Sequence, residues 1–210
     1  MSMSGPAEVT NCVAIRLSGS GGQGLLLAGR LLAEAAALHD GLDVVQTNSY
    51  GPEARGGASH SDVVIGRGEI DILHSEKVDA LVCLSQASCD AYYPALVHDG
   101  LLLIDSDSVK IVPTTRAVEV PMSSLAREKA GNVMVANVIA LAALCAISNV
   151  VTKRALVETV RDRVPPAHRA LNSRAIEAGF VAARQALARK SAKARGLLPD
   201  FAFLREMPRA

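Results

Sequence analysis

The sequence predicts an α/β domain with a mostly parallel, open sheet and helices on both of its faces. Short apolar runs alternate with segments of helical periodicity from residue 12 to residue 120, as in parallel sheets covered by helices. A glycine-rich turn at 18–24 separates the first apolar run from a leucine-rich segment, which is the strand–turn–helix order of Rossmann-like folds. Helical patterns follow residue 120. We therefore expect a Rossmann-like domain with a helical C-terminal part.

Apolar runs and their flanking residues give the order of the elements. Buried strands are expected at 12–17, 43–47, 63–65, 80–84, 101–104 and 118–120, with another apolar segment at 70–73. Helices are expected at 25–39, 87–97 and 123–130, then at 133–147 after an Asn132 cap and at 153–163 after a Thr152 cap. After Pro165 and Pro166, a last helix shows one apolar face at Ile176, Phe180, Ala183 and Leu187. Residues 1–190 are therefore expected to form a single domain.

Composition and charge argue against several classes of protein. Half of the 210 residues are hydrophobic and the net charge is +1, so nothing in the overall charge favours a nucleic-acid partner. The apolar segment at 133–147 is interrupted by Asn137 and is shorter than the ~20 residues that a membrane-spanning helix needs. Residues 1–11 lack the features of a signal peptide. We expect a cytoplasmic protein with no membrane span.

The four cysteines are widely scattered and lie in apolar segments, at Cys12, Cys83, Cys89 and Cys145. No C-x-x-C motif occurs, so this chain is expected to hold neither an iron–sulfur cluster nor structural zinc. Reduced thiols in the core of a cytoplasmic protein fit this pattern. We assign no metal site to this chain.

The glycine-rich turn is the first candidate site. Gly19, Gly21 and Gly24 match the dinucleotide-binding pattern G-x-G-x-x-G. Such a turn leaves backbone N–H groups free and directs them, with the positive end of the next helix, at an anion. NAD binding also requires an acidic residue at the end of the second strand, which here ends in Gln46, Thr47 and Asn48. The pattern is compatible with a diphosphate ligand but does not indicate NAD specificity. A tight turn that packs the helix on the sheet and binds nothing is the other interpretation.

The segment from Thr47 to His60 is the second candidate site. We expect it to be a long loop at the carboxyl edge of the sheet, where folds of this class bind ligands. Arg55 would bind a carboxylate or phosphate, or else pair with Glu53. His60 would serve as an acid or base, or be merely solvated. Because no nucleophile–histidine–acid set is apparent, the two loops indicate a binding surface rather than a complete catalytic centre.

Two stretches at a fixed distance make the sequence recognisable. The first is Gly19-Ser20-Gly21-Gly22-Gln23-Gly24 with Leu27-Ala28-Gly29, and the second is Gln46 with Ser49-Tyr50-Gly51-Pro52-Glu53-Ala54-Arg55-Gly56-Gly57. Together they resemble the gamma subunit of 2-oxoacid:ferredoxin oxidoreductases, the family of the pyruvate, 2-oxoglutarate and ketoisovalerate enzymes. The resemblance runs from about Val13 to Arg184 and includes 62–65, 84–87, 105–106 and 132–137.

The resemblance implies one subunit of a cytoplasmic, oxygen-sensitive enzyme that oxidatively decarboxylates a 2-oxoacid to an acyl-CoA. Thiamine diphosphate, Mg and iron–sulfur clusters would lie on companion alpha, beta and iron–sulfur subunits, which pass electrons to ferredoxin or another acceptor. It implies coenzyme A binding in this chain at Gly19, Ser20, Gly21, Gly22, Gln23 and Gly24. It implies a substrate channel or subunit interface at Ser49, Tyr50, Gly51, Pro52, Glu53, Arg55, Gly56 and Gly57. No residue of this chain is assigned a catalytic role.

Two alternatives belong to other functional classes. One is a stand-alone NAD-type dinucleotide-binding oxidoreductase, against which the missing acidic residue counts. The other is a purely structural subunit whose loops are subunit contacts, against which the two glycine-bearing loops count mildly.

The C-terminal residues differ in composition from the rest of the chain. Seven Lys or Arg and two Asp or Glu give residues 184–210 a net charge of +5, which leaves −4 for residues 1–183. Two of the three phenylalanines, Phe201 and Phe203, also lie there. We expect residues 191–210 to extend from the domain as a basic tail that docks on a companion subunit, because interfaces favour aromatic and Arg side chains. A solvated, disordered tail is the alternative.

Overall fold

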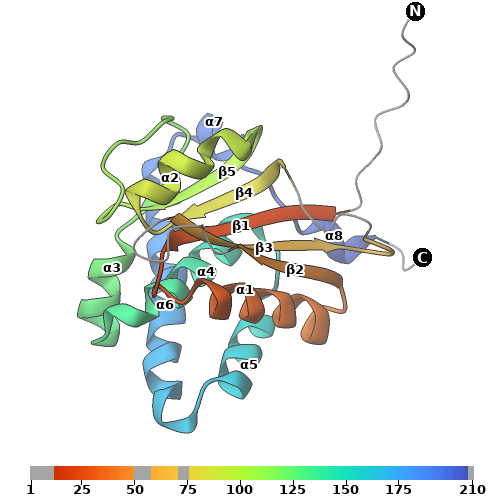
Figure 1. Ribbon diagram of the computed structural model, residues 1–210, viewed down its shortest axis with the longest axis vertical. Helices are drawn as coiled ribbons and strands as arrows, with labels where there is room; N and C mark the ends of the chain where they lie inside the picture. The colour runs from red at the N-terminus through yellow and green to blue at the C-terminus, as the bar shows by residue number, and fades with distance from the viewer. Residues whose placement is uncertain (1–11, 50–57, 71–75, 208–210) are drawn as a thin grey trace, which may run out of the picture.

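The computed structural model describes residues 12–49, 58–70 and 76–207 of the chain (Figure 1). Within these residues, one sheet has the strand order β2-β3-β1-β4-β5-β6. The strands are β1 (Cys12–Ser20), β2 (Asp43–Ser49), β3 (Ala58–Gly66), β4 (Val78–Cys83), β5 (Leu96–Asp105) and β6 (Val118–Val120). β1, β4, β5 and β6 are parallel, whereas β3 runs antiparallel to both of its neighbours. The expected mostly parallel sheet is confirmed.

The antiparallel strand β3 corrects the expectation of a long loop from Asn48 to His60. β2 continues to Ser49 and β3 begins at Ala58, so the ladder pairs Ser49 with His60 and Asn48 with Ser61. Only residues 50–57 connect these strands, and a parallel crossover needs a dozen or more residues. The polar composition of 58–62 concealed the strand, because ladder hydrogen bonds are made by the backbone whatever the side chains are. The segment expected at 70–73 lies mostly outside the described residues.

Helices cover both faces of the sheet, as expected, but unequally (Figure 1). On one face lie α1 (Leu25–Glu34) with its π-helical extension η1 (Ala35–His39), α4 (Ala136–Ser148), α5 (Lys153–Arg163) and α6 (Pro166–Arg189). The other face carries α2 (Gln86–Tyr92) and the 3-10 turn η2 (Tyr93–Ala95). Shorter elements are α3 (Met122–Leu125), η3 (Ala126–Ala130), η4 (Val133–Val135), α7 (Ala192–Arg195) and α8 (Phe203–Glu206).

Alternating side chains of the strands build two hydrophobic clusters, one on each face. In β1, Val13, Ile15 and Leu17 join the cluster that contains α1 and α4, whereas Ala14 joins the cluster beneath α2. All residues of α4 except Ala146 are buried, which confirms the expected core helix. No helix among the described residues is long and apolar enough to cross a membrane.

The expected helix starts are confirmed by their hydrogen bonds. The Asn132 side chain accepts from the backbone N–H of Met134 at 2.9 Å, where a 3-10 turn precedes α4. The Thr152 hydroxyl accepts from the N–H of Ala155 at 3.1 Å and begins α5. Pro166 occupies the first turn of α6, where its missing N–H costs no hydrogen bond.

The expectation that residues beyond 190 leave the domain is wrong for the residues described. Phe201 and Leu204 are buried and belong to the main hydrophobic cluster. The Phe201 N–H donates to the Ser148 carbonyl at 2.7 Å, and Arg67 Nε donates to the Leu204 carbonyl at 2.9 Å. The phenylalanine-bearing end of the chain therefore completes the core of its own domain. Leu197 and Phe203 remain 55% and 42% exposed.

We expect Leu204→Ala to lower the free energy of unfolding of the full chain by about 2–5 kcal/mol, the usual cost of emptying a buried leucine site. Leu197→Ala makes the same chemical change at an exposed position and is expected to cost no more than about 0.5 kcal/mol. Urea unfolding followed by circular dichroism measures both. Equal losses for the two variants would contradict the packing of this segment on the domain.

Candidate functional site

The glycine-rich turn lies between β1 and α1, at the carboxyl end of the parallel strands. Ser18, Gly19 and Ser20 still belong to β1 and pair with His60, Ser59 and Ala58 of β3. The chain leaves the sheet only after Ser20, and α1 begins at Leu25. The expected strand–turn–helix unit is confirmed, with a turn that is shorter than the expected 18–24.

The four glycines of the loop fall into two kinds. At Gly19 a Cβ would overlap Gln23 Oε1, and at Gly24 it would stand 2.5 Å from Asn137 Nδ2. At Gly21 and Gly22 a Cβ would meet no atom within 4 Å. Gly22 and Gly24 also have φ angles of 88° and 71°, a region that glycine adopts without steric cost. The inner glycines permit close packing, whereas the outer pair faces open space.

The outer part of the loop presents backbone N–H groups. Among the described residues, no acceptor binds the N–H groups of Gly21, Gly22 or Gly24. The first turn of α1 has neither a side-chain cap nor an acidic residue. The unpaired amides and the positive end of the helix therefore favour an anion at this position.

Gln23 braces the loop from within. Its Oε1 accepts from the Ser20 N–H at 2.7 Å, and its Nε2 donates to the Leu84 carbonyl at 3.1 Å. Leu84 follows β4, and its own N–H donates to the Ser18 carbonyl at 2.9 Å. The side-chain amide of Gln23 thus joins the ends of two neighbouring strands. A contact between Gln23 and a ligand stays a prediction.

Asn137 is a second support of the loop, and the sequence showed it only as an interruption of an apolar segment. It is 4% exposed, its Nδ2 donates to the Gly24 carbonyl at 3.0 Å, and its Oδ1 accepts from the Val138 N–H at 2.8 Å. An amide inside an otherwise apolar helix is the signal that could have indicated this role, because buried polar groups require partners.

The second predicted loop starts and ends beside the first. Ser49, the last residue of β2, pairs with His60, and Ala58, the first residue of β3, pairs with Ser20. Both ends of the 50–57 connection therefore lie at the sheet edge that carries the glycine loop. Outside the described residues lie Tyr50, Gly51, Pro52, Glu53, Arg55, Gly56 and Gly57.

His60 lies in β3 and not in a solvated loop, and it belongs to a polar cluster that the sequence did not reveal. Its side chain is 14% exposed, and its Nε2 lies 3.7 Å from Asp62 Oδ2. Asp62 accepts two hydrogen bonds from Arg16, at 2.8 and 2.6 Å, and these bonds raise the pKa of the guanidinium. Tyr92 of α2 lies edge-on to the His60 ring and donates to the Ala58 carbonyl at 3.0 Å. The pairing of β1 with β3, which brings Arg16 opposite Asp62, had to be known to find this cluster.

The thiols are enclosed rather than gathered into a metal site. Cys83, Cys89 and Cys145 are buried and Cys12 is partly buried, all four in the reduced form. Burial raises the pKa of Cys145 to about 12, and a hydrogen bond with Cys89 together with burial raises the pKa of Cys83 well above its ordinary value. Within the described residues, His, Cys, Asp and Glu form no group of three or more that could hold a metal ion.

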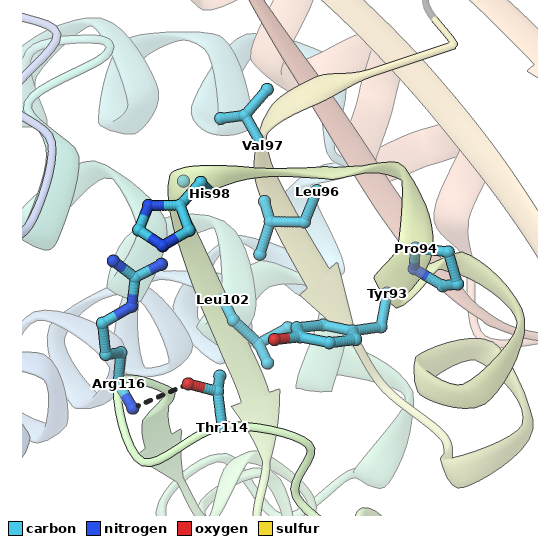
Figure 2. Close-up of a pocket in the computed structure, with 9 residues that line it drawn as sticks. Tyr93, Pro94, Leu96, Val97, His98, Leu102, Thr114 and Arg116 are labelled. Atoms are coloured by element: carbon cyan, nitrogen blue, oxygen red, sulfur yellow. Dashed lines mark hydrogen bonds between the residues drawn. The ribbon is translucent and has the colours of Figure 1, made fainter.

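A cavity of about 490 Å³ opens at the amino end of β5, at the edge of the sheet opposite to the glycine loop. Figure 2 shows Tyr93 beside Leu102 in this cavity, with His98 and Arg116 close together. Arg116 Nη1 already donates to Asp99 Oδ1 at 2.9 Å, so the guanidinium is paired with an acidic side chain. The cavity is therefore a weaker anion site than the loop.

The fold and the loop define a Rossmann-like domain with unpaired backbone N–H groups, within the described residues, at the carboxyl edge of its sheet. The chain belongs to the pyruvate ferredoxin/flavodoxin oxidoreductase family, whose model matches residues 14–182. The 2-oxoglutarate synthase subunit KorC of Methanocaldococcus jannaschii is 42% identical over 178 residues, which cover 81% of this chain and 94% of that protein.

Solved structures agree with this assignment. The keto/oxoacid ferredoxin oxidoreductase gamma subunit from Geobacter sulfurreducens PCA is 44% identical, with a TM-score of 0.77 over 83% of this chain and 98% of that chain. A 2-oxoglutarate:ferredoxin oxidoreductase from Magnetococcus marinus has the same fold at 21% identity, with a TM-score of 0.74 over 84% of this chain and 32% of that chain. The expected gamma subunit of a multi-subunit 2-oxoacid:ferredoxin oxidoreductase is confirmed.

We expect thiol-labelling reagents to modify the folded chain slowly at mildly alkaline pH, and Cys12 first. The raised pKa values of Cys12, Cys83 and Cys145 keep these three thiols protonated there, and only the thiolate reacts. The hydrogen bond with Cys83 lowers the pKa of Cys89, but Cys89 is buried and out of reach of the reagent. Unfolding in guanidinium makes all four cysteines react at once. A disulfide reagent that releases a chromophore measures how many thiols react before and after unfolding. Cys12→Ser is expected to remove the first thiol to react in the folded chain. Fast reaction of Cys145 in the folded chain would contradict its burial.

Proposed function

We propose that this chain binds the diphosphate of coenzyme A with its glycine loop, as the gamma subunit of an enzyme that converts a 2-oxoacid to an acyl-CoA. The observation that carries the proposal is the set of backbone N–H groups at Gly21, Gly22 and Gly24, unpaired within the described residues, at the uncapped start of α1. The open space at Gly21 and Gly22 leaves room for a phosphate to approach the backbone. Family membership supplies the reaction class.

In this proposal the chain binds and orients one reactant and performs no proton transfer. Backbone N–H groups carry no titratable proton, so the loop holds the diphosphate over a wide pH range. Thiamine diphosphate supplies the carbanion stabilisation when it is bound, and we assign it, with Mg and the iron–sulfur clusters, to companion alpha, beta and iron–sulfur subunits.

The second loop extends the proposal to the 2-oxoacid. Both ends of this connection lie beside the glycine loop. We therefore assign the following residues to the substrate channel or the subunit interface: Ser49, Tyr50, Gly51, Pro52, Glu53, Arg55, Gly56 and Gly57. KorC of Methanocaldococcus jannaschii is named a 2-oxoglutarate synthase subunit, so 2-oxoglutarate is the first 2-oxoacid to assay. Ferredoxin is the first electron acceptor to assay, and we assign the assembled enzyme to the cytoplasm.

Neither alternative has gained support from a specific contact. Against NAD binding, the carboxyl end of β2 carries Gln46, Thr47 and Asn48, and Gln46 Nε2 donates to Ser61 Oγ at 3.0 Å beneath α1. A purely structural role does not account for the N–H groups of Gly21, Gly22 and Gly24, which have no acceptor within the described residues.

The exposed side of the C-terminal segment is the proposed docking surface for a companion subunit. Leu197 and Phe203 keep exposed apolar side chains, while Phe201 and Leu204 anchor the segment from below. Lys193 in α7 and Arg205 in α8 are basic residues of the same segment, and Arg205 Nη1 donates to the Asn149 carbonyl at 2.6 Å. Aromatic side chains with a basic surround are typical of interface anchors.

Gly22→Asp in the assembled enzyme is expected to raise the KM for coenzyme A about 10- to 150-fold, which corresponds to roughly 1.5–3 kcal/mol, and to leave the KM for the 2-oxoacid nearly unchanged. The new carboxylate would stand where the diphosphate binds. Gly22→Asn has the same size and the same tolerance of a positive φ without the charge, so it separates charge from backbone strain. Unchanged use of coenzyme A by Gly22→Asp would reject the assignment.

Phe203→Asp is expected to weaken association with the companion subunits at least tenfold, because it places a charge on an apolar contact. The variant keeps the buried Leu204 and therefore the fold. Analytical size exclusion of mixtures at low and high salt measures assembly, and Ala192→Asp in α7 serves as an exposed control for the added charge. Normal assembly of Phe203→Asp would show that this segment only completes the domain.

A further inference from the structure

We infer that Gln23 and Asn137 are positioning residues that set the electrostatics of the glycine loop by occupying its inward-facing polar groups. The inference rests on the proposed coenzyme A site. It explains which polar groups of the loop face the ligand and which do not. Neither side chain needs to touch the ligand for this purpose.

Two carbonyls that flank the turn, those of Ser20 and Gly24, accept hydrogen bonds within the chain. The Gly24 carbonyl accepts two hydrogen bonds at 3.0 Å, from the Ala28 N–H and from Asn137 Nδ2. The Ser20 carbonyl accepts from the Gln23 N–H at 3.3 Å. A free carbonyl oxygen carries partial negative charge and would repel a diphosphate, whereas a carbonyl that accepts two bonds is largely neutralised.

Gln23 acts on the other side of the turn. Its Oε1 accepts a hydrogen bond from the Ser20 N–H at 2.7 Å, and its Nε2 donates to the Leu84 carbonyl, just beyond the end of β4. The loop thereby takes its position from the central strands. The N–H groups left for an anion are those of Gly21, Gly22 and Gly24 and the first turn of α1.

The glycines of the loop also divide into two that contact the amide side chains and two that face open space. Gly19 has no room for a Cβ because Gln23 Oε1 occupies the space, and Gly24 has none because Asn137 Nδ2 does. Gly21 and Gly22, which no side chain approaches, remain open. Each inner glycine is thus matched to one amide side chain. Sterically and electrostatically, the two amides form the inner wall of the site.

The test uses the assembled enzyme with Gln23→Met and Asn137→Leu, which keep side-chain volume and remove the hydrogen bonds. We expect each variant to raise the KM for coenzyme A about tenfold. The KM for the 2-oxoacid is expected to stay unchanged. The specific readout is the ratio of kcat/KM for coenzyme A to that for pantetheine, which lacks the diphosphate. This ratio is expected to fall about tenfold, since use of pantetheine does not depend on the anion site.

Two matched controls exclude a general loss of packing. Asn172, buried in α6, donates from Nδ2 to the His168 carbonyl at 2.9 Å, so Asn172→Leu removes a comparable bond elsewhere. Gln86 accepts from the Lys110 and Ile111 N–H groups at 2.8 and 2.9 Å, so Gln86→Met removes a comparable brace. Both controls are expected to lower the melting temperature and to leave the coenzyme A to pantetheine ratio unchanged.

The outcomes separate this inference from the proposed function. If Gly22→Asp impairs use of coenzyme A while Gln23→Met and Asn137→Leu keep the wild-type ratio, the positioning role is wrong and the site remains. If Gly22→Asp also has no effect, the proposed site itself fails. Should Asn137→Leu not assemble, Gln23→Met alone decides, because the exposed turn next to it tolerates a local change.

Discussion

The structure depends on the tight turn between β1 and α1, where the side-chain amides of Gln23 and Asn137 form hydrogen bonds with the backbone. Between Ser20 and Leu25 the chain turns from β1 into α1. A Cβ would meet a side-chain amide at Gly19, near the end of β1, and at Gly24, just before α1. Two side-chain amides enter the space that those glycines leave. The position of α1 on the sheet, the contact of α4 with the turn and the direction of the free N–H groups all follow from this arrangement.

The close approach of α1 to the sheet continues beyond the turn. At Gly29 a Cβ would lie 2.7 Å from Gln46 Nε2 and would overlap Ser61 Oγ, so the helix rests directly on polar side chains of β2 and β3. Within the same helical layer, the absence of a side chain at Gly179 of α6 lets this helix approach Ala142 of α4 closely. Small residues thus set the thickness of the layer that covers the main cluster.

Local patterns in the sequence were sufficient to predict the strand–turn–helix unit, the buried helix α4 and the caps at Asn132 and Thr152, because neighbouring residues determine these features. The β2–β3 pairing was missed because the polar residues 58–62 resemble a loop, and the strands expected at 43–47 and 63–65 left a connection long enough for a parallel crossover. The supports Gln23 and Asn137 and the Arg16–Asp62 pair required contacts over 46 to 113 positions of sequence. The inward turn of the C-terminal segment was missed for the same reason, because composition shows that Phe201 is apolar but not which surface it covers.

The ion pair between Arg16 and Asp62 fixes the register between β1 and β3. Sliding β3 by a single residue along β1 would face Arg16 with Ser61 or Val63 and leave a mostly enclosed charge uncompensated. The same ladder sets Ala58 opposite Ser20 four positions further on. This salt bridge therefore fixes the register that places the two ends of the 50–57 connection beside the glycine loop, and insertions within 50–57 would leave those ends in place.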